Sequence, residues 1–167
     1  MIALLQRGIF ALTLLSFSSI MSEEIRSYKG DTVLDHVSFS VSNYIQSLSF
    51  YDETLRLLGI ERLMNFDTGE GKIAGYGIKG RPSFWISYAI APKPEESIGK
   101  AQGLHIAFRA PSVKAIQEWH KKCLELGGID NGAPSPRPQY HPGYYGAFII
   151  DPNGWKIEAS LHDYKGQ

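Results

Sequence analysis

Cysteine and net charge are what this sequence lacks most plainly. Its 167 residues contain one cysteine, Cys123, which excludes an intrachain disulfide framework and a CxxC zinc site. The 17 Lys and Arg residues balance 17 Asp and Glu residues, and the chain has no polybasic run. The positive field that holds nucleic acid or an anionic membrane surface is therefore missing. We expect neither to be a stable partner of the folded domain.

An apolar run of membrane-spanning length is also missing. Residues 1–20 carry a single charge, Arg7, and two apolar runs, but the polar interruption at 6–8 leaves them short of a span. They resemble a secretory leader or a weak mitochondrial presequence. Alternatively, Met21 is the working start, because residues 21–24 look like an ordinary amino terminus. We expect a cytoplasmic protein if Met21 is the start, and otherwise a secreted or mitochondrial one.

What the sequence does contain is an internal repeat. Residues 34–60 and residues 103–129 resemble each other without a gap, each position being shifted by 69. The shift relates His36 to His105. Repeats of this kind indicate two similar structural units. Because the chain is short enough for one domain, we expect two pseudo-equivalent halves that share a core.

Alternation and capping signals predict the elements of the first half. Apolar and polar residues alternate from residue 33, which favours a strand. Asn43 is a plausible N-cap for the helical stripe that follows, and Gly59 is placed as a C-terminal glycine would be. The glycine-rich residues 62–90 suit two or three short antiparallel strands. Residues 92–96 are predicted to be a linker stiffened by proline.

The second half follows the same plan. Alternation over residues 104–109 precedes Ser112, the predicted cap of a helix that ends at a pair of glycines. Residues 146–161 form a predicted hairpin around an Asp-Pro-Asn-Gly turn. Each half is thus predicted as strand, helix and three strands. The predicted boundaries are a candidate leader at 1–20, an arm at 21–32, one domain at 33–163 with halves at about 33–91 and 102–163, and a tail at 164–167.

Three polar residues are predicted to lie on the polar faces of their strands, because side chains alternate between the two faces. His36 and His105 begin equivalent strands, and Glu158 lies in the last strand. Small or polar side chains share their strand faces, whereas the alternate faces are apolar and belong under helices. The polar faces leave room for a cavity. Two imidazoles and one carboxylate there would form a metal site with open coordination positions for Fe, Zn, Mn or Ni.

Other candidate site residues lie on the same faces or in a loop nearby. Trp85 would offer an aromatic wall to a substrate, or is a core tryptophan. Arg109 would hold an anionic substrate group, or reaches solvent. The loop 140–145 would supply titratable groups near a bound substrate, or is a rigid loop that packs its aromatic rings. The candidates are His141 and Tyr144 for acid–base catalysis, and Trp85, Arg109 and Tyr145 for substrate contact.

Four motifs point to a known family. They are DHV at 35–37, FYD at 50–52, HIAF at 105–108, and a tail that runs from Asn131 through Asp151-Pro152-Asn153-Gly154 to Ala159. These motifs resemble the glyoxalase, bleomycin-resistance and extradiol dioxygenase superfamily, also called the vicinal oxygen chelate group. The resemblance covers about residues 33–163, and the tail is similar to a glyoxalase-like subgroup.

The resemblance implies an α+β fold of tandem βαβββ modules, with curved mixed sheets around a metal cavity, helices on the outer face, and a homodimer. His36, His105 and Glu158 match positions that bind the divalent metal in the family. A fourth position, often glutamate in glyoxalases, corresponds to Ser87 by a shift of 71 residues. Serine is a poor ligand, so the pattern looks more like the three-ligand dioxygenase and thiol-transfer branches.

The functional expectation follows from these residues together with the resemblance. We expect a divalent-metal-dependent enzyme that acts on a small, chelating, oxygen-bearing substrate, either as a lyase or isomerase or as a dioxygenase. The alternative is a non-catalytic protein of the bleomycin-resistance type that binds a small molecule on the same fold. Fold alone does not choose between them, because function belongs to the site.

Overall fold

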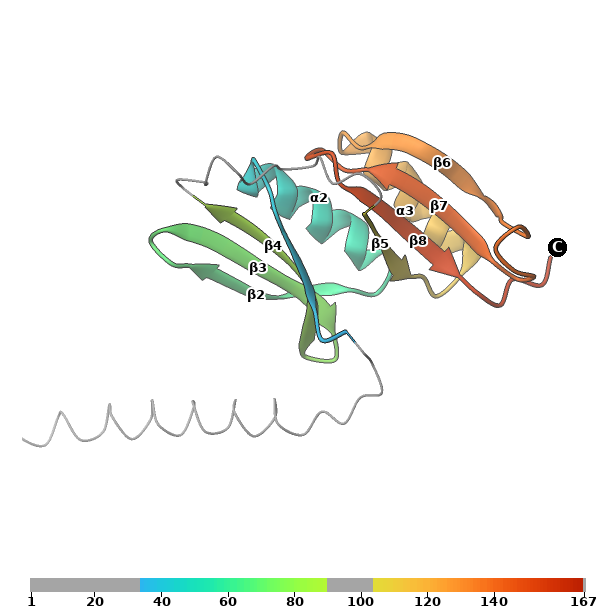
Figure 1. Ribbon diagram of the computed structural model, residues 1–167, viewed down its shortest axis with the longest axis horizontal. Coiled ribbons are helices and arrows are strands. Elements are labelled where there is room, and N and C mark those ends of the chain that lie inside the picture. The colour runs from blue at the N-terminus through green and yellow to red at the C-terminus, as the bar shows by residue number, and fades with distance from the viewer. Residues whose placement is uncertain (1–33, 90–103, 167) are drawn as a thin grey trace, which may run out of the picture. The chain divides into compact units, whose positions relative to one another are not determined.

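The computed structural model describes residues 34–89 and 104–166, in which two sets of elements follow the same order (Figure 1). The first set is β1 (Val37–Ser40), α2 (Tyr44–Arg56), β2 (Glu61–Asp67), β3 (Gly71–Ile78) and β4 (Arg81–Ala89). The second set is β5 (His105–Arg109), α3 (Val113–Glu125), β6 (Ile129–Pro136), β7 (Tyr145–Ile150) and β8 (Lys156–Leu161). The predicted plan of strand, helix and three strands in each half is confirmed.

Both helices begin where the sequence predicts. The side chain of Asn43 accepts a hydrogen bond from the Gln46 backbone N–H at 3.1 Å, and Ser112 accepts one from Ala115 at 3.1 Å. Each cap satisfies a backbone donor that has no partner inside its helix. After α2 the chain turns at Gly59, whose φ of 77° suits a residue without a β-carbon.

Each half forms one mixed four-stranded sheet. The strand orders are β1-β4-β3-β2 and β5-β8-β7-β6. In each sheet the first strand pairs in parallel with the last strand of its half, and the remaining pairs are antiparallel. The helix supplies the crossover that a parallel pair requires. The α+β class with two pseudo-equivalent βαβββ halves is therefore confirmed.

The buried apolar residues lie where the strand alternation predicts. In β1 and β5, Phe39 and Phe108 are buried, whereas Ser38 and Ala107 are exposed. The buried side chains pack with those of the helices; Tyr51 of α2, for example, lies 5.1 Å from Phe84 between ring centroids. The sheet faces that carry His36 and His105 are thus turned away from the core.

One junction between the halves is closed by the turn that joins β7 to β8. The Trp155 ring stacks on Phe39 with centroids 4.8 Å apart, and its Nε1–H donates to the Ser40 carbonyl at 2.9 Å. In the same turn the buried Asp151 accepts a hydrogen bond from the hydroxyl of Tyr51 at 2.6 Å. These contacts tie the second sheet to the edge strand and helix of the first half.

The strand registers give the relation between the halves, and they correct one detail. Ser38 pairs with Trp85 and its repeat counterpart Ala107 pairs with Glu158, so the offset is 69 in the first strand and 73 in the last (158 − 85). The 71-residue shift that related Ser87 to Glu158 is wrong. Ser87 corresponds to Ser160, and their carbonyls accept equivalent hydrogen bonds from Val41 and Ala110 at 2.8 Å. Sequence similarity alone did not reveal the unequal loop lengths.

Some expectations lie outside the described residues. These are the leader at 1–20, the arm at 21–32 and the linker at 92–96. Within the part of the chain that the structure describes, no helix has the length and apolar character needed to cross a membrane.

Candidate functional site

The second half brings two of the three predicted metal ligands together. His105 begins β5, and Glu158 lies on the neighbouring strand β8. The Nε2 atom of His105 is 3.3 Å from Oε2 of Glu158. The glutamate side chain is 2 % exposed and the histidine side chain is 52 % exposed. Burial of an unpaired charge is costly, so the carboxylate of Glu158 requires partners that donate hydrogen bonds to it. The exposed imidazole of His105 is placed to be one of them.

Tyr144 supplies the second partner of this carboxylate. Its hydroxyl donates a short hydrogen bond to Oε1 of Glu158. Burial, and then the bond to Glu158, raises the pKa of Tyr144 to about 12, so the phenol remains a donor at neutral pH. Gly146 makes the approach possible, because a β-carbon there would lie 3.0 Å from Oε1 and 3.1 Å from the Tyr144 ring. The sequence identified Tyr144, but as an acid or base rather than as a donor to Glu158.

His36 does not join this pair within the described residues of one chain. It is an exposed residue immediately before β1, on the equivalent edge of the first sheet. Across residues 34–89 and 104–166 no group of three His, Cys, Asp or Glu side chains is arranged to hold a metal ion. The structure therefore supplies two of the predicted ligands as a pair and the third at a separate place.

Trp85 occupies the first-half position that Glu158 occupies in the second. It is half-buried and lies on the same side of β4 as Ser87. Its ring packs over Gly75, where a β-carbon would come within 2.6 Å of the ring. The glycine lets the indole lie flat on the sheet. The first half thus presents an aromatic surface where the second half presents a carboxylate.

Arg137 is a cation near the pair that was not among the residues predicted from the sequence. Its guanidinium lies 5.4 Å from the ring centroid of Phe148, which pairs with Glu158 and shares its sheet face. One Nη2–H donates to the Ala133 carbonyl at 2.9 Å, while its buried Nε has no hydrogen-bond partner among the described residues. A cation beside an aromatic ring with a spare donor suits recognition of an anionic oxygen. Its signal in the sequence was its place in the tail motif that begins at Asn131.

The other predicted residues are divided between two faces. His141 Nε2 lies 3.0 Å from Nδ1 of His162, and both rings contact the ring of Tyr144. His141 therefore belongs to a cluster that borders Glu158 through Tyr144. Tyr145 is buried on the opposite face, where its ring packs on Tyr164 and its hydroxyl accepts a bond from α3. The structure does not bring Tyr145 to the pair.

Arg109 lies at the end of β5, four residues beyond His105. It is exposed and shares the parity of His105 along the strand. It also contributes to the lining of an apolar pocket of about 420 Å³ next to the strand edge. Its position is compatible with contact to an anionic ligand, but in that pocket rather than beside Glu158.

Comparison with protein families agrees with the fold. The model of the Glyoxalase/Bleomycin resistance protein/Dioxygenase superfamily matches residues 33–159, most of the chain. The chain belongs to this superfamily. Members of the superfamily typically use a divalent metal ion, and the donors of the pair fit one in kind, since an imidazole nitrogen and a carboxylate oxygen suit several divalent metals.

Solved structures with the same fold include other members of the superfamily. A glyoxalase/bleomycin resistance protein from Albidiferax ferrireducens T118 is 24 % identical, with a TM-score of 0.62 over 77 % of this chain and 98 % of that one. Glyoxalase I from Zea mays is 22 % identical, with a TM-score of 0.61 over 77 % of this chain. The present chain covers 45 % of the maize chain, so it spans about half the length of that relative. Among curated protein sequences none matches.

Proposed function

We propose that this chain is a divalent-metal-dependent enzyme of the superfamily, acting on a small substrate that chelates through oxygen. The single observation that carries the proposal is the buried carboxylate of Glu158, held between His105 and Tyr144 on an open sheet face. A binding pocket made only by apolar packing would have no use for a carboxylate that is almost fully removed from water.

The proposed metal ligands are His105, Glu158 and His36. Since the described residues of one chain do not group all three, we propose that His36 comes from a second copy in a homodimer. Each copy exposes the polar face of both halves, so a two-fold arrangement can apply the first half of one copy to the second half of the other. Two equal sites would result, each with one histidine from one chain and the pair from the other.

The roles of the chain's own residues follow from their contacts. Tyr144 fixes one oxygen of Glu158 and leaves the other directed at His105. Partners that hold a ligand in this manner set its orientation and its affinity for an ion. Arg137 is placed to bind an anionic oxygen of the substrate, and Trp85 offers an apolar wall from the first half.

A bound divalent ion would supply Lewis-acid chemistry, namely polarisation of a substrate oxygen and stabilisation of negative charge on it. The exposed imidazole of His105 leaves the pair open to solvent on one side, so a substrate can enter there. Tyr144 holds its proton at neutral pH and therefore serves as a hydrogen-bond donor. The acid or base of the reaction is assigned to the neighbouring His141, which meets the Tyr144 ring at 5.3 Å between centroids.

The test is the metal content of the purified full chain, measured by elemental mass spectrometry after anaerobic reconstitution with iron, zinc, manganese or nickel. We expect about one ion per chain. Glu158→Gln and His105→Ala should each lose it while remaining folded by circular dichroism. Glu53→Gln, which changes an exposed glutamate of α2, is the matched control and should keep it. An ion-free parent after reconstitution would overturn the proposal.

A second candidate is a non-catalytic protein that binds a small molecule. The observation that favours it is Trp85, whose ring lies flat over Gly75 and offers a stacking surface. In that case a planar compound would quench tryptophan fluorescence in the parent and not in Trp85→Leu, without conversion to product. Loss of metal binding in Glu158→Gln together with loss of turnover would decide for the enzyme.

A further inference from the structure

The two halves are joined at two related places, and only one of them is filled. At the first, the turn between β7 and β8 packs on the end of β1, with Trp155 between them. At the second, the turn between β3 and β4 faces the end of β5. By the offset of 69, Phe108 corresponds to Phe39. An extra residue in β4 shifts the register before Phe84, so Arg81, which pairs with Ile78, takes the position of Trp155. The second place therefore has no aromatic side chain at the position where the first has an indole.

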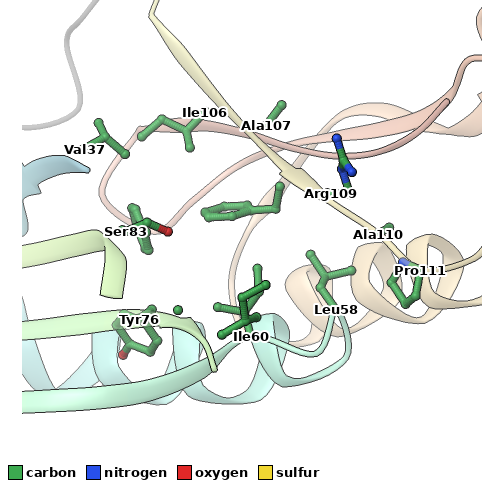
Figure 2. Close-up of a pocket in the computed structure, with 14 residues that line it drawn as sticks. Val37, Leu58, Ile60, Tyr76, Ser83, Ile106, Ala107, Arg109, Ala110 and Pro111 are labelled. Carbon is green, nitrogen blue, oxygen red and sulfur yellow. The ribbon is translucent and has the colours of Figure 1, made fainter. Parts of the chain in front are cut away.

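The second place contains the pocket of about 420 Å³ (Figure 2). Figure 2 shows Leu58 and Ile60 on one side of it and Val37 and Ile106 on the other. Phe84 and Phe108 also line it, with ring centroids 5.1 Å apart. Small-molecule sites have volumes of about 300–1,000 Å³ and mainly apolar linings with few polar groups. The size and the lining both fit that class.

The filled junction indicates what the open one would accept. Trp155 is 9 % exposed, stacks on Phe39 at 4.8 Å and donates Nε1–H to the carbonyl of Ser40 at 2.9 Å. The corresponding groups of the pocket are the ring of Phe108 and the main chain of Arg109. An indole-like group thus meets an aromatic face and a strand-edge acceptor at either place.

Arg109 distinguishes the pocket from its filled counterpart. It lies at the position of Ser40, is exposed, and belongs to the pocket lining. A guanidinium at the rim favours a ligand with a carboxylate or phosphate beside the aromatic ring. His105 and Glu158 do not line the pocket, and the side chains of Ile106 and Phe108 point to the other face of β5 from His105.

We propose that this junction pocket is a binding site for a planar, bicyclic aromatic anion of the indole carboxylate type, separate from the Glu158 site. The ring would stack on Phe108 as Trp155 stacks on Phe39, and its acidic group would meet Arg109. The site does not depend on a metal ion, so its test is independent of the proposed enzyme function.

The experiment is calorimetric titration of the full chain with indole-3-acetate and with neutral indole. We expect saturable binding of indole-3-acetate with a Kd below about 1 mM. Arg109→Gln should raise the Kd of indole-3-acetate about tenfold and leave the Kd of neutral indole unchanged. His105→Ala should bind both compounds as the parent does, which separates this site from the proposed metal site.

Two variants fill the pocket from its own wall. Ile78→Trp and Ser83→Trp each add an indole at an exposed residue that lines the pocket. Either variant should raise the Kd of both compounds at least about tenfold while keeping the parent's circular dichroism spectrum. Ile129→Trp is the control, because Ile129 is 63 % exposed and does not line the pocket.

The outcomes are decisive in both directions. Loss of binding in the folded filling variants, with retention in Ile129→Trp, supports the junction pocket. Undiminished binding in Ile78→Trp and Ser83→Trp would place the ligand elsewhere, for example on Trp85, and would overturn the proposal. Failure of the parent to bind either compound would also overturn it, whatever the metal content proves to be.

Discussion

Trp85 and Glu158 occupy the same position in the two sheets. Trp85 pairs with Ser38 on β1, and Glu158 pairs with Ala107, the repeat counterpart of Ser38, on β5. One half therefore carries an indole at the place where the other carries a buried carboxylate. The two halves thus share the same backbone arrangement, but their side chains at this position differ in chemistry. A carboxylate ligand comes from one half only, so each site of the proposed enzyme has three protein ligands.

The contact between Trp85 and Gly75 gives the first prediction. A β-carbon at residue 75 would lie 2.6 Å from the Trp85 ring, so Gly75→Val must displace the indole. We expect a loss of about 1–3 kcal/mol in the free energy of unfolding, which is typical of overpacking. The measurement is chemical denaturation followed by circular dichroism, with tryptophan fluorescence as a local probe. In Gly75→Val/Trp85→Leu the loss should be smaller than the sum of the two single changes. Additive losses would contradict the contact.

The shared site gives the second prediction. If His36 of one copy meets His105 and Glu158 of another, His36→Ala and Glu158→Gln should each abolish metal binding. A mixed dimer of the two variants, made by co-expression with two affinity tags, contains one intact site. We expect about half of the parent's metal content in the purified mixed dimer. Metal-free mixed dimers from a parent that binds one ion per chain would place all three ligands within one chain.

The hydrogen bond from Tyr144 to Glu158 gives the third prediction. Tyr144→Phe removes the donor and leaves one carboxylate oxygen without it. Metal affinity should fall about 10- to 100-fold, the usual effect of losing a partner that orients a ligand. Competition with a chelator of known affinity measures this. Tyr140→Phe is the control, because that tyrosine packs on Tyr144 at 5.1 Å without a hydrogen bond to Glu158. Equal affinities in the two variants would contradict the assignment.

The same tyrosine gives a prediction about pH. Burial raises the pKa of Tyr144 from 10.0 to about 12, so the folded protein keeps a proton that the unfolded chain releases. The stability from this group is therefore complete below pH 10 and is lost as pH rises from 10 to about 12. The parent should lose more stability over this window than Tyr144→Phe. Parallel urea titrations at pH 9 and pH 11 measure the difference, and equal losses would be contrary to it.

The filled junction gives the fifth prediction. Tyr51 donates to the buried Asp151 at 2.6 Å, and Asp151 also accepts from the Trp155 backbone N–H at 2.7 Å. Tyr51→Phe leaves that carboxylate short of a partner and should cost about 1–3 kcal/mol of unfolding free energy. Tyr140→Phe removes a hydroxyl from a residue that is mostly exposed and should cost far less. A loss for Tyr51→Phe no larger than for this control would show that the bond is not important for stability.

Local patterns in the sequence were sufficient for the elements and for the fold class. The caps Asn43 and Ser112, the alternation of the strands and the turn at Gly59 each depend on neighbours within a few residues. The repeat added the fact that both halves fold alike. The place of Glu158 on the strand face equivalent to that of the two histidines was also predictable, because side chains alternate along a strand.

What the sequence by itself determined is the βαβββ plan of each half, the faces of its strands and the candidate ligands on them. Only the tertiary structure decided that Trp85, and not Ser87, corresponds to Glu158, that Tyr144 binds this glutamate, and that one junction is filled by Trp155 while the other is open. The physical reason is the separation along the chain of the residues that interact. Periodicity and capping act between near neighbours, whereas strand register and junction packing depend on pairs of residues far apart in the chain, whose separation a gapless repeat does not encode.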